Sequence, residues 1–381
     1  MAPTVLIIGA SVTGLTAAHA LLRDVPNAKI VLVNPSSYFY WMIAAPRIVA
    51  KASAFKSDQY LIPIKEAFSQ YPAESFEFIL GAATAIDPST KTVTITSSGS
   101  EQSVTYDHLL IASGSTTPAT IGELSGLSIP FKNSNRDDMK ELIEAAQQKI
   151  KSVKNIVIGG AGPIGVEVAG ELAEAVAANG QEVDITLVSS ADRVLPMLKP
   201  SAGSTAEKQL KQKKVKIITS TRVLGAETSG ENSWTVTLDN GKTLSTELYI
   251  PTTGDVPNNS FIPKQFLDAD GWVKIDKELR VVGDSLPIYA AGDIGNNSMR
   301  LSLKAVEQAK IAANNIKVDI LGKGARKSYD QGDSIMMMVP VGSTGGSGQI
   351  FGFVPFNFLV KMAKGGDYFV SKAAATVAGK S

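Results

Sequence analysis

Cysteine is absent from the 381 residues, and histidine occurs only twice, at His19 and His108. Without a thiol the chain cannot form a disulfide, a thiolate zinc site, an iron–sulfur cluster or a redox-active dithiol. Two histidines are too few for a histidine-based metal site, so we expect no bound metal. Any redox chemistry must therefore come from an organic cofactor that the protein holds.

The chain also lacks an excess of charge of either sign. It has 37 Lys and Arg against 36 Asp and Glu, a formal net charge of +1, and 44% hydrophobic residues. We expect no nucleic-acid partner, because phosphate binding needs a clustered basic face. The apolar content excludes disorder as a description of the whole chain, and the length predicts two or three domains.

Targeting signals and long apolar runs are also missing. No apolar run reaches the roughly 18 residues of a spanning helix. Residues 1–4 have neither a basic n-region nor a cleavage site, so we expect no signal peptide. Ala2 occupies the position where N-myristoylation needs glycine. We expect a cytoplasmic protein, and association with a membrane or with lipid droplets stays open.

The first 34 residues predict a strand–helix–strand unit. Residues 5–9 and 29–34 are apolar runs typical of buried strands, and residues 13–23 have helical spacing. The turn follows the pattern G-x-G-x-x-G from Gly9 to Gly14, with Ser11 in place of the middle glycine. Such a turn places a helix N-terminus against a pyrophosphate. Asn34 stands where an acid usually binds the ribose, so these residues alone support a dinucleotide site and an empty turn equally.

A second such unit comprises residues 155–159, 163–178 and 183–188. It carries a complete G-x-G-x-x-G pattern, Gly160, Gly162 and Gly165, between strand and helix. Ser189 ends the next strand, where NAD-selective sites tend to place an acid, and Arg193 follows four residues later. This pair favours NADPH, or acceptance of both dinucleotides, although a merely solvated Arg193 fits the sequence as well.

The remaining segments complete an α/β architecture. Short β-branched runs at 76–112 and 223–249 predict antiparallel meanders, and residues 287–291 and 303–316 predict a last strand and helix. We predict two Rossmann-like dinucleotide-binding domains plus a small α+β C-terminal domain. The predicted boundaries are 1–125 and 254–322 for the discontinuous FAD domain, 126–253 for the NAD(P)H domain, and 323–381 for the C-terminal domain.

The order of these motifs resembles the two-dinucleotide-binding flavoprotein superfamily. Residues 106–114 are similar to its second FAD motif, 253–258 to its return segment, and Gly292-Asp293 to the segment whose acid holds the ribityl chain. The C-terminal stretches 348–353 and 360–370 look like the ferroptosis-suppressor (apoptosis-inducing factor 2) family, as do 44–47 and 165–167. That family reduces quinones with NAD(P)H through bound FAD.

The resemblance implies a set of cofactor-binding residues. For FAD these are Gly9, Ser11, Gly14, Asn34, Arg47, Ser113, Gly114, Asp293 and Gln308. For NAD(P)H they are Gly160, Gly162, Gly165, Ser189 and Arg193.

Two residues are predicted to be catalytic. Glu167 lies in the first turns of the second helix, where a carboxylate could position the nicotinamide carboxamide or relay a proton; the alternative is a helix-dipole partner. Lys364 resembles a family lysine near flavin or quinone, where a cation would stabilise reduced flavin or a quinone oxyanion. A solvated lysine is an equally good interpretation of Lys364.

The C-terminal aromatic residues leave the acceptor open. They could form a quinone slot, a surface that contacts a membrane, or a small core, and an alternating Phe351 and Phe353 pair is more typical of the buried face of a strand. The methionines at 336–338 are expected to fill core. A quinone-type acceptor is our first expectation; a ferredoxin- or rubredoxin-type protein and a redox-dependent binding role with slow NAD(P)H oxidation are the alternatives. We expect a monomer or a homodimer.

Overall fold

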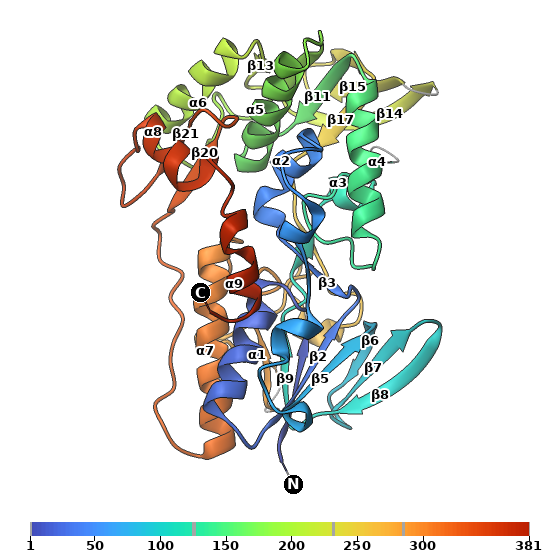
Figure 1. The fold of residues 1–381 in the computed structure, drawn as a ribbon, viewed down its shortest axis with the longest axis vertical. Coiled ribbons are helices and arrows are strands. Elements are labelled where there is room, and N and C mark those ends of the chain that lie inside the picture. Colours follow the sequence, from blue (N-terminus) through green and yellow to red (C-terminus); the bar gives the residue numbers. More distant parts are fainter. Residues whose placement is uncertain (1, 124–126, 231–232, 284–285, 381) are drawn as a thin grey trace.

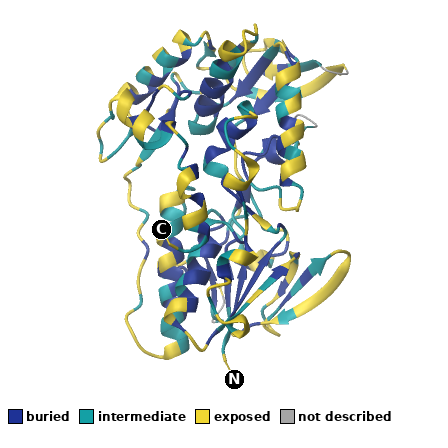
Figure 2. Ribbon diagram, in the orientation of Figure 1, coloured by how far each residue is buried: buried dark blue, intermediate teal, exposed yellow. Residues whose placement is uncertain are grey.

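The computed structural model describes residues 2–123, 127–230, 233–283 and 286–380. Two α/β bodies are stacked along the long axis, and the C-terminal segment runs beside both of them (Figure 1). Buried residues concentrate in the sheets and the helices that cover them (Figure 2). No helix within the described ranges is long and apolar enough to cross a membrane.

The first body is built on a five-stranded parallel sheet with strand order β19-β9-β1-β2-β5. Its strands are β1 (Thr4–Ile8), β2 (Lys29–Asn34), β5 (Phe76–Leu80), β9 (His108–Ile111) and β19 (Ile288–Ala290). Helices α1 (Val12–Asp24) and α7 (Ser302–Leu321) pack against each other on one face. On β1, Val5 and Ile7 face the cluster that includes these helices, while Leu6 and Ile8 join a second cluster on the other face.

That second face is covered by an antiparallel meander, β6 (Ala82–Asp87), β7 (Thr92–Ser97) and β8 (Ser100–Thr105). The prediction of one meander over residues 76–112 is therefore partly wrong, because only residues 82–105 form it. Strands β5 and β9, at its two ends, pair in parallel with β2 and β1. Near-continuous apolar strands suit a sheet covered on both faces, which explains why β9 belongs to it.

The second body repeats this plan with a four-stranded parallel sheet of order β13-β12-β11-β17. Its strands are β11 (Asn155–Gly159), β12 (Asp184–Val188), β13 (Lys216–Ile218) and β17 (Leu248–Pro251). The helices of this body are α4 (Met139–Ser152), α5 (Pro163–Ala178) and α6 (Pro200–Gln212). A second meander comprises β14 (Val223–Gly230), β15 (Ser233–Leu238) and β16 (Thr243–Thr246).

Short elements complete the first body and the junction with the second. They are β3 (Tyr38–Tyr40), β4 (Leu61–Pro63), α2 (Ala45–Ala50), β10 (Ser115–Thr116), α3 (Pro118–Ile121) and β18 (Val256–Pro257).

The C-terminal segment joins the two bodies. It forms the hairpin β20 (Met337–Pro340) and β21 (Gly346–Gln349), helix α8 (Asn357–Val360), a π-helical turn Lys361–Gly365 and helix α9 (Ala373–Val377). β20 packs on α5 and β21 on α6, whereas α9 packs on α1. The C-terminal residues therefore contact both dinucleotide-binding bodies. Met336 is exposed and Met337 and Met338 are half-buried, so the methionine run is not simply core filler.

Candidate active site

The first glycine turn needs glycine at both of the positions the sequence singled out. Gly9 has φ +105°, and a Cβ there would lie 2.3 Å from the carbonyl oxygen of Ala112. A Cβ on Gly14 would lie 1.8 Å from the oxygen of Gly9. Ser11 is the N-cap of α1, and its side chain makes no capping hydrogen bond. The turn therefore presents the open N-terminus of α1, as a bound pyrophosphate requires.

Asn34 braces that turn from the end of β2. Its Oδ1 accepts a hydrogen bond from the backbone N–H of Ala10 at 2.9 Å, and its Nδ2 donates to the oxygen of Ser36 at 2.8 Å. A carboxylate does reach this end of the strand, but from elsewhere in the chain: Asp137 Oδ1 accepts from Ser36 Oγ at 3.1 Å and from the N–H of Ser37 at 2.8 Å. The sequence analysis did not identify Asp137.

The second glycine turn has the same build as the first. Gly160 has φ +118°, and a Cβ on Gly165 would lie 1.9 Å from the oxygen of Gly160. At Gly162, the N-cap of α5, a Cβ would meet only Met197 Cε, at 4.0 Å. Space at this position fits a pyrophosphate approaching the α5 N-terminus.

Ser189 and Arg193 lie together at the end of β12. Ser189 is buried, and its hydroxyl donates to the carbonyl oxygen of Arg193 at 2.8 Å. Arg193 pairs with Asp192 at 3.0 Å and donates to the oxygen of Pro196 at 3.1 Å. Its buried Nε has no partner within the described residues.

Ser113, beside Gly114, connects the end of β9 to the return segment 253–258 by hydrogen bonds. Ser113 Oγ donates to the oxygen of Asn258 at 2.8 Å, and Asn258 Nδ2 donates back to the oxygen of Ser113 at 2.8 Å. Gln308, on α7, accepts from the N–H of Gly292 at 2.6 Å and donates to the oxygen of Asn297 at 3.0 Å. The amide of Gln308 is thus engaged in shaping the loop that carries Asp293.

Asp293 is tied to a buried lysine that the sequence analysis missed. Lys132 Nζ lies 2.9 Å from Asp293 Oδ2, 2.7 Å from Asp255 Oδ1 and 2.5 Å from Ser115 Oγ. Burial alone would lower the pKa of Lys132, but the two carboxylates outweigh it and raise that pKa. Within the described residues nothing bonds Asp293 Oδ1, which leaves this oxygen for a ribityl hydroxyl.

The two predicted catalytic residues meet. Lys364 Nζ donates to Glu167 Oε1 at 2.6 Å and to the oxygen of Met338 at 3.2 Å. Glu167 is buried on α5, and Lys364 is mostly buried on the π-helical turn. Burial raises the pKa of Glu167, and the Lys364 ammonium offsets only part of this rise. The interpretation of Lys364 as a solvated lysine is therefore not supported. Glu167 lies beyond the first turn of α5, where the helix dipole acts most strongly.

Arg47, predicted to bind FAD, directs its guanidinium at protein groups. Its Nε and Nη2 donate to the two carboxylate oxygens of Glu171 at 3.0 and 2.8 Å. Its Nη1 and Nη2 also donate to the oxygens of Gly366 and Gly365 at 2.7 and 2.8 Å. The guanidinium lies 4.7 Å from the centre of the Tyr368 ring. Arg47 thus joins α2 and α5 to the turn that carries Lys364.

Glu167 is the first of three carboxylates along one face of α5. Glu171 follows after four residues and Glu174 after three more, so the spacing places them in line. Lys51 lies 2.7 Å from Glu171 and 3.0 Å from Glu174, and Lys213 lies 3.2 Å from Glu174. The carboxylate spacing was visible in the sequence, but its partners come from distant segments.

A family model described as pyridine nucleotide-disulphide oxidoreductase matches residues 3–309. The chain belongs to this family. The curated relatives include the oxidoreductase ptaL of Pestalotiopsis fici, 35% identical over 381 residues and 98% of both chains. Ferroptosis suppressor protein 1 of Homo sapiens is 28% identical over 98% of this chain and 95% of that protein. The sulfide:quinone oxidoreductase of Aquifex aeolicus has the same fold, with a TM-score of 0.79 at 17% identity, covering 98% of this chain and 92% of that one.

These comparisons confirm three predictions. They are the fold class, the likeness to ferroptosis suppressors, and FAD with NAD(P)H as the cofactors. The protein is an NAD(P)H-dependent flavin oxidoreductase. The disulphide chemistry in the family's description requires thiols, and this member has no cysteine to supply them. Its electrons must pass from the flavin to an acceptor that is not a cysteine pair of its own chain.

Proposed function

We propose that this oxidoreductase passes electrons from NAD(P)H through FAD to a quinone-type acceptor. The observation that carries the proposal is the Lys364–Glu167 pair, which couples a cation to a buried carboxyl whose pKa is raised. The pair places a positive charge beside a group that can take up and release a proton. Quinone reduction needs both, because negative charge develops on the quinone oxygens before they are protonated.

The stoichiometry calls for a group that handles protons. When bound, FAD accepts a hydride from NAD(P)H and later releases two electrons. A hydride carries two electrons and one proton, whereas a quinone takes two electrons and two protons to become a hydroquinone. The second proton comes from solvent, and in this proposal the buried Glu167 takes it up and transfers it.

Lys364 retains the capacity to bind an acceptor oxygen. An ammonium has three N–H donors. Within the described residues Lys364 uses two of them, one on Glu167 and one on the oxygen of Met338. The third donor can stabilise a developing oxyanion. Proton transfer from Lys364 or Glu167 would follow within the same hydrogen-bonded pair.

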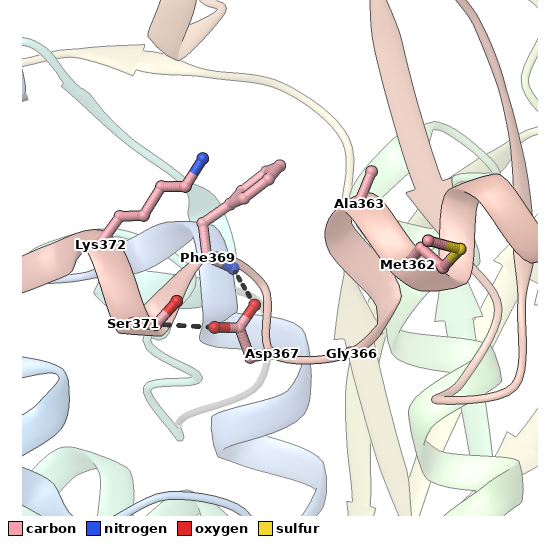
Figure 3. A pocket seen from close by; sticks show the side chains of 7 residues that line it. All are labelled: Met362, Ala363, Gly366, Asp367, Phe369, Ser371 and Lys372. Atoms are coloured by element: carbon pink, nitrogen blue, oxygen red, sulfur yellow. Dashed lines mark hydrogen bonds between the residues drawn. The ribbon is translucent and has the colours of Figure 1, made fainter.

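An open cavity of about 570 Å³ with both polar and apolar lining residues adjoins the Lys364 turn. It is lined by Met362, Ala363, Gly366, Asp367, Phe369, Ser371 and Lys372. Figure 3 shows Met362 and Ala363 on one side of it and Phe369 and Lys372 on the other. Met and Phe walls suit the flat, apolar ring of a quinone.

Steady-state reduction of a short-chain ubiquinone by NADPH and by NADH tests the proposal. We expect Glu167→Gln to lower quinone turnover while Glu182→Gln, an exposed carboxylate just after α5, does not. Flavin that NAD(P)H reduces but that quinone fails to reoxidise would contradict the proposal. It would point instead to a small redox protein as acceptor, or to a signalling role.

A further inference from the structure

The C-terminal segment exposes aromatic side chains that a folded protein normally buries. Phe351, Phe353 and Phe356 are 76%, 77% and 74% exposed. Met362, on the π-helical turn, is 76% exposed, and Phe358 stacks beside Phe356 with the ring centres 6.1 Å apart. These five side chains form what we call the aromatic tip. The expectation of a buried strand face for Phe351 and Phe353 is therefore wrong.

The backbone at Phe351, in the aromatic tip, adopts a strained left-handed conformation. Ile350 and Phe353 exchange backbone hydrogen bonds of 2.9 and 2.8 Å around a two-residue turn. Both turn residues have positive φ, +47° at Phe351 and +78° at Gly352. Such a turn favours Asn or Gly at its first position, and a phenylalanine there is unfavourable. Burial of the ring does not offset this cost, and strain without a folding benefit is typical of functional sites.

Positive charge predominates along the segment of the tip. Residues 334–366 contain no acidic residue and two lysines, of which Lys361 is exposed and Lys364 is paired with Glu167. Asp367 follows directly and lines the cavity. Lys361 is exposed beside Met362, and exposed Lys199 lies at the same end, with its backbone N–H bonded to Gln349 at 3.0 Å. Exposed Lys372 follows on the far side of the cavity. Apolar side chains flanked by exposed lysines are typical of surfaces that enter an anionic lipid interface.

We propose that the aromatic tip docks on an anionic lipid bilayer, with its phenylalanines at the headgroup–acyl boundary and the surrounding lysines on acidic headgroups. A second copy of this chain fits the surface less well, because a two-fold contact would oppose the lysines of one tip to those of the other. The proposal goes beyond the proposed acceptor and does not rest on it, since lipid binding is measured without turnover.

Vesicle flotation of the FAD-loaded protein tests this inference. We expect binding to phosphatidylcholine vesicles that contain phosphatidylserine, weaker binding to phosphatidylcholine alone, and weakening by salt. Phe353→Ser should reduce binding about tenfold or more, as expected for withdrawing one phenylalanine from an apolar phase. The control Leu303→Ser removes a 65%-exposed side chain on α7 and should leave binding unchanged.

A second variant guards against misfolding as the cause of lost binding. Phe351→Asn places a residue that tolerates positive φ in the turn, so its thermal stability should equal or exceed that of the natural protein while vesicle binding falls. Its turnover with a short-chain quinone should be unchanged. Equal vesicle binding by both tip variants and the natural protein would overturn the proposal. So would a concentration-dependent dimer that Phe353→Ser dissociates, because that result would make a second copy the occupant.

Discussion

Lys364 Nζ lies 2.6 Å from Glu167 Oε1, although 197 residues separate the two in the chain. The pair joins the C-terminal turn to the helix that follows the second glycine motif. Because Glu167 is buried and Lys364 nearly so, the interaction is shielded from solvent. A desolvated pair of this kind responds strongly to loss of either charge.

Lys364→Met should therefore impair the acceptor half of the reaction. Removing a donor that stabilises an oxyanion lowers a rate about 100-fold. We expect such a loss for reoxidation of reduced flavin by quinone, with little change in flavin reduction by NAD(P)H. Stopped-flow absorbance separates the two halves, and Lys361→Met, an exposed lysine on the same turn, is the control. Equal slowing of both halves would argue against a specific role at the acceptor.

Arg47→Met should destabilise the fold. The substitution removes four hydrogen bonds of a buried guanidinium and leaves Glu171 with Lys51 as its remaining cation. Breaking one side of a buried pair costs about 3 kcal/mol or more. Urea unfolding should show this loss, while exposed Arg136→Met shows none. The double variant with Glu171→Gln should be less destabilised than the sum of the single variants.

Glu174 makes acid stability depend on the C-terminal segment. Burial alone would raise its pKa, but hydrogen bonds from Ser343 and Lys51 outweigh this and lower the pKa to about 2. The unfolded chain then binds a proton that the folded chain does not, so stability falls as pH drops from about 4.5 towards 2. In Glu174→Gln this contribution is gone, and urea midpoints should vary less with pH over that range. A slope identical to that of the natural protein would contradict the assignment.

Lys132→Met should weaken FAD binding. Lys132 contacts Asp293 through Oδ2, and without it Asp293 keeps only the hydroxyl of Ser115, while Asp255 keeps only Arg300 at 4.0 Å. We expect the dissociation constant of FAD, measured by flavin fluorescence, to rise about tenfold, the effect of losing one charge-assisted hydrogen bond. Lys140→Met, at an exposed position on α4, is the control. Unchanged FAD affinity would restrict Lys132 to a structural role.

The glycine turns could be predicted from sequence because their constraint is local. A Cβ at Gly14 or Gly165 would collide with a backbone oxygen only five residues earlier. A short sequence motif is therefore enough to predict the need for glycine. Helix α5 and strand β11 begin and end where the apolar spacing predicts.

The interdomain contacts could not be predicted in the same way. Arg47 and Glu171 are 124 residues apart, and neither residue type alone indicates the other. Phe351 was misread because its alternation with Phe353 imitates a strand. The Gly352 turn, with two positive φ angles in succession, reverses the chain at that point.

An anaerobic absorbance titration tests the central claim most directly. The purified protein would be titrated with NADPH and then NADH, after which a short-chain ubiquinone is added. We predict flavin absorbance that bleaches with the dinucleotide and returns on addition of quinone. Bleached flavin that persists in the presence of quinone would contradict the proposed acceptor, and a protein that holds no flavin after reconstitution would contradict the account as a whole.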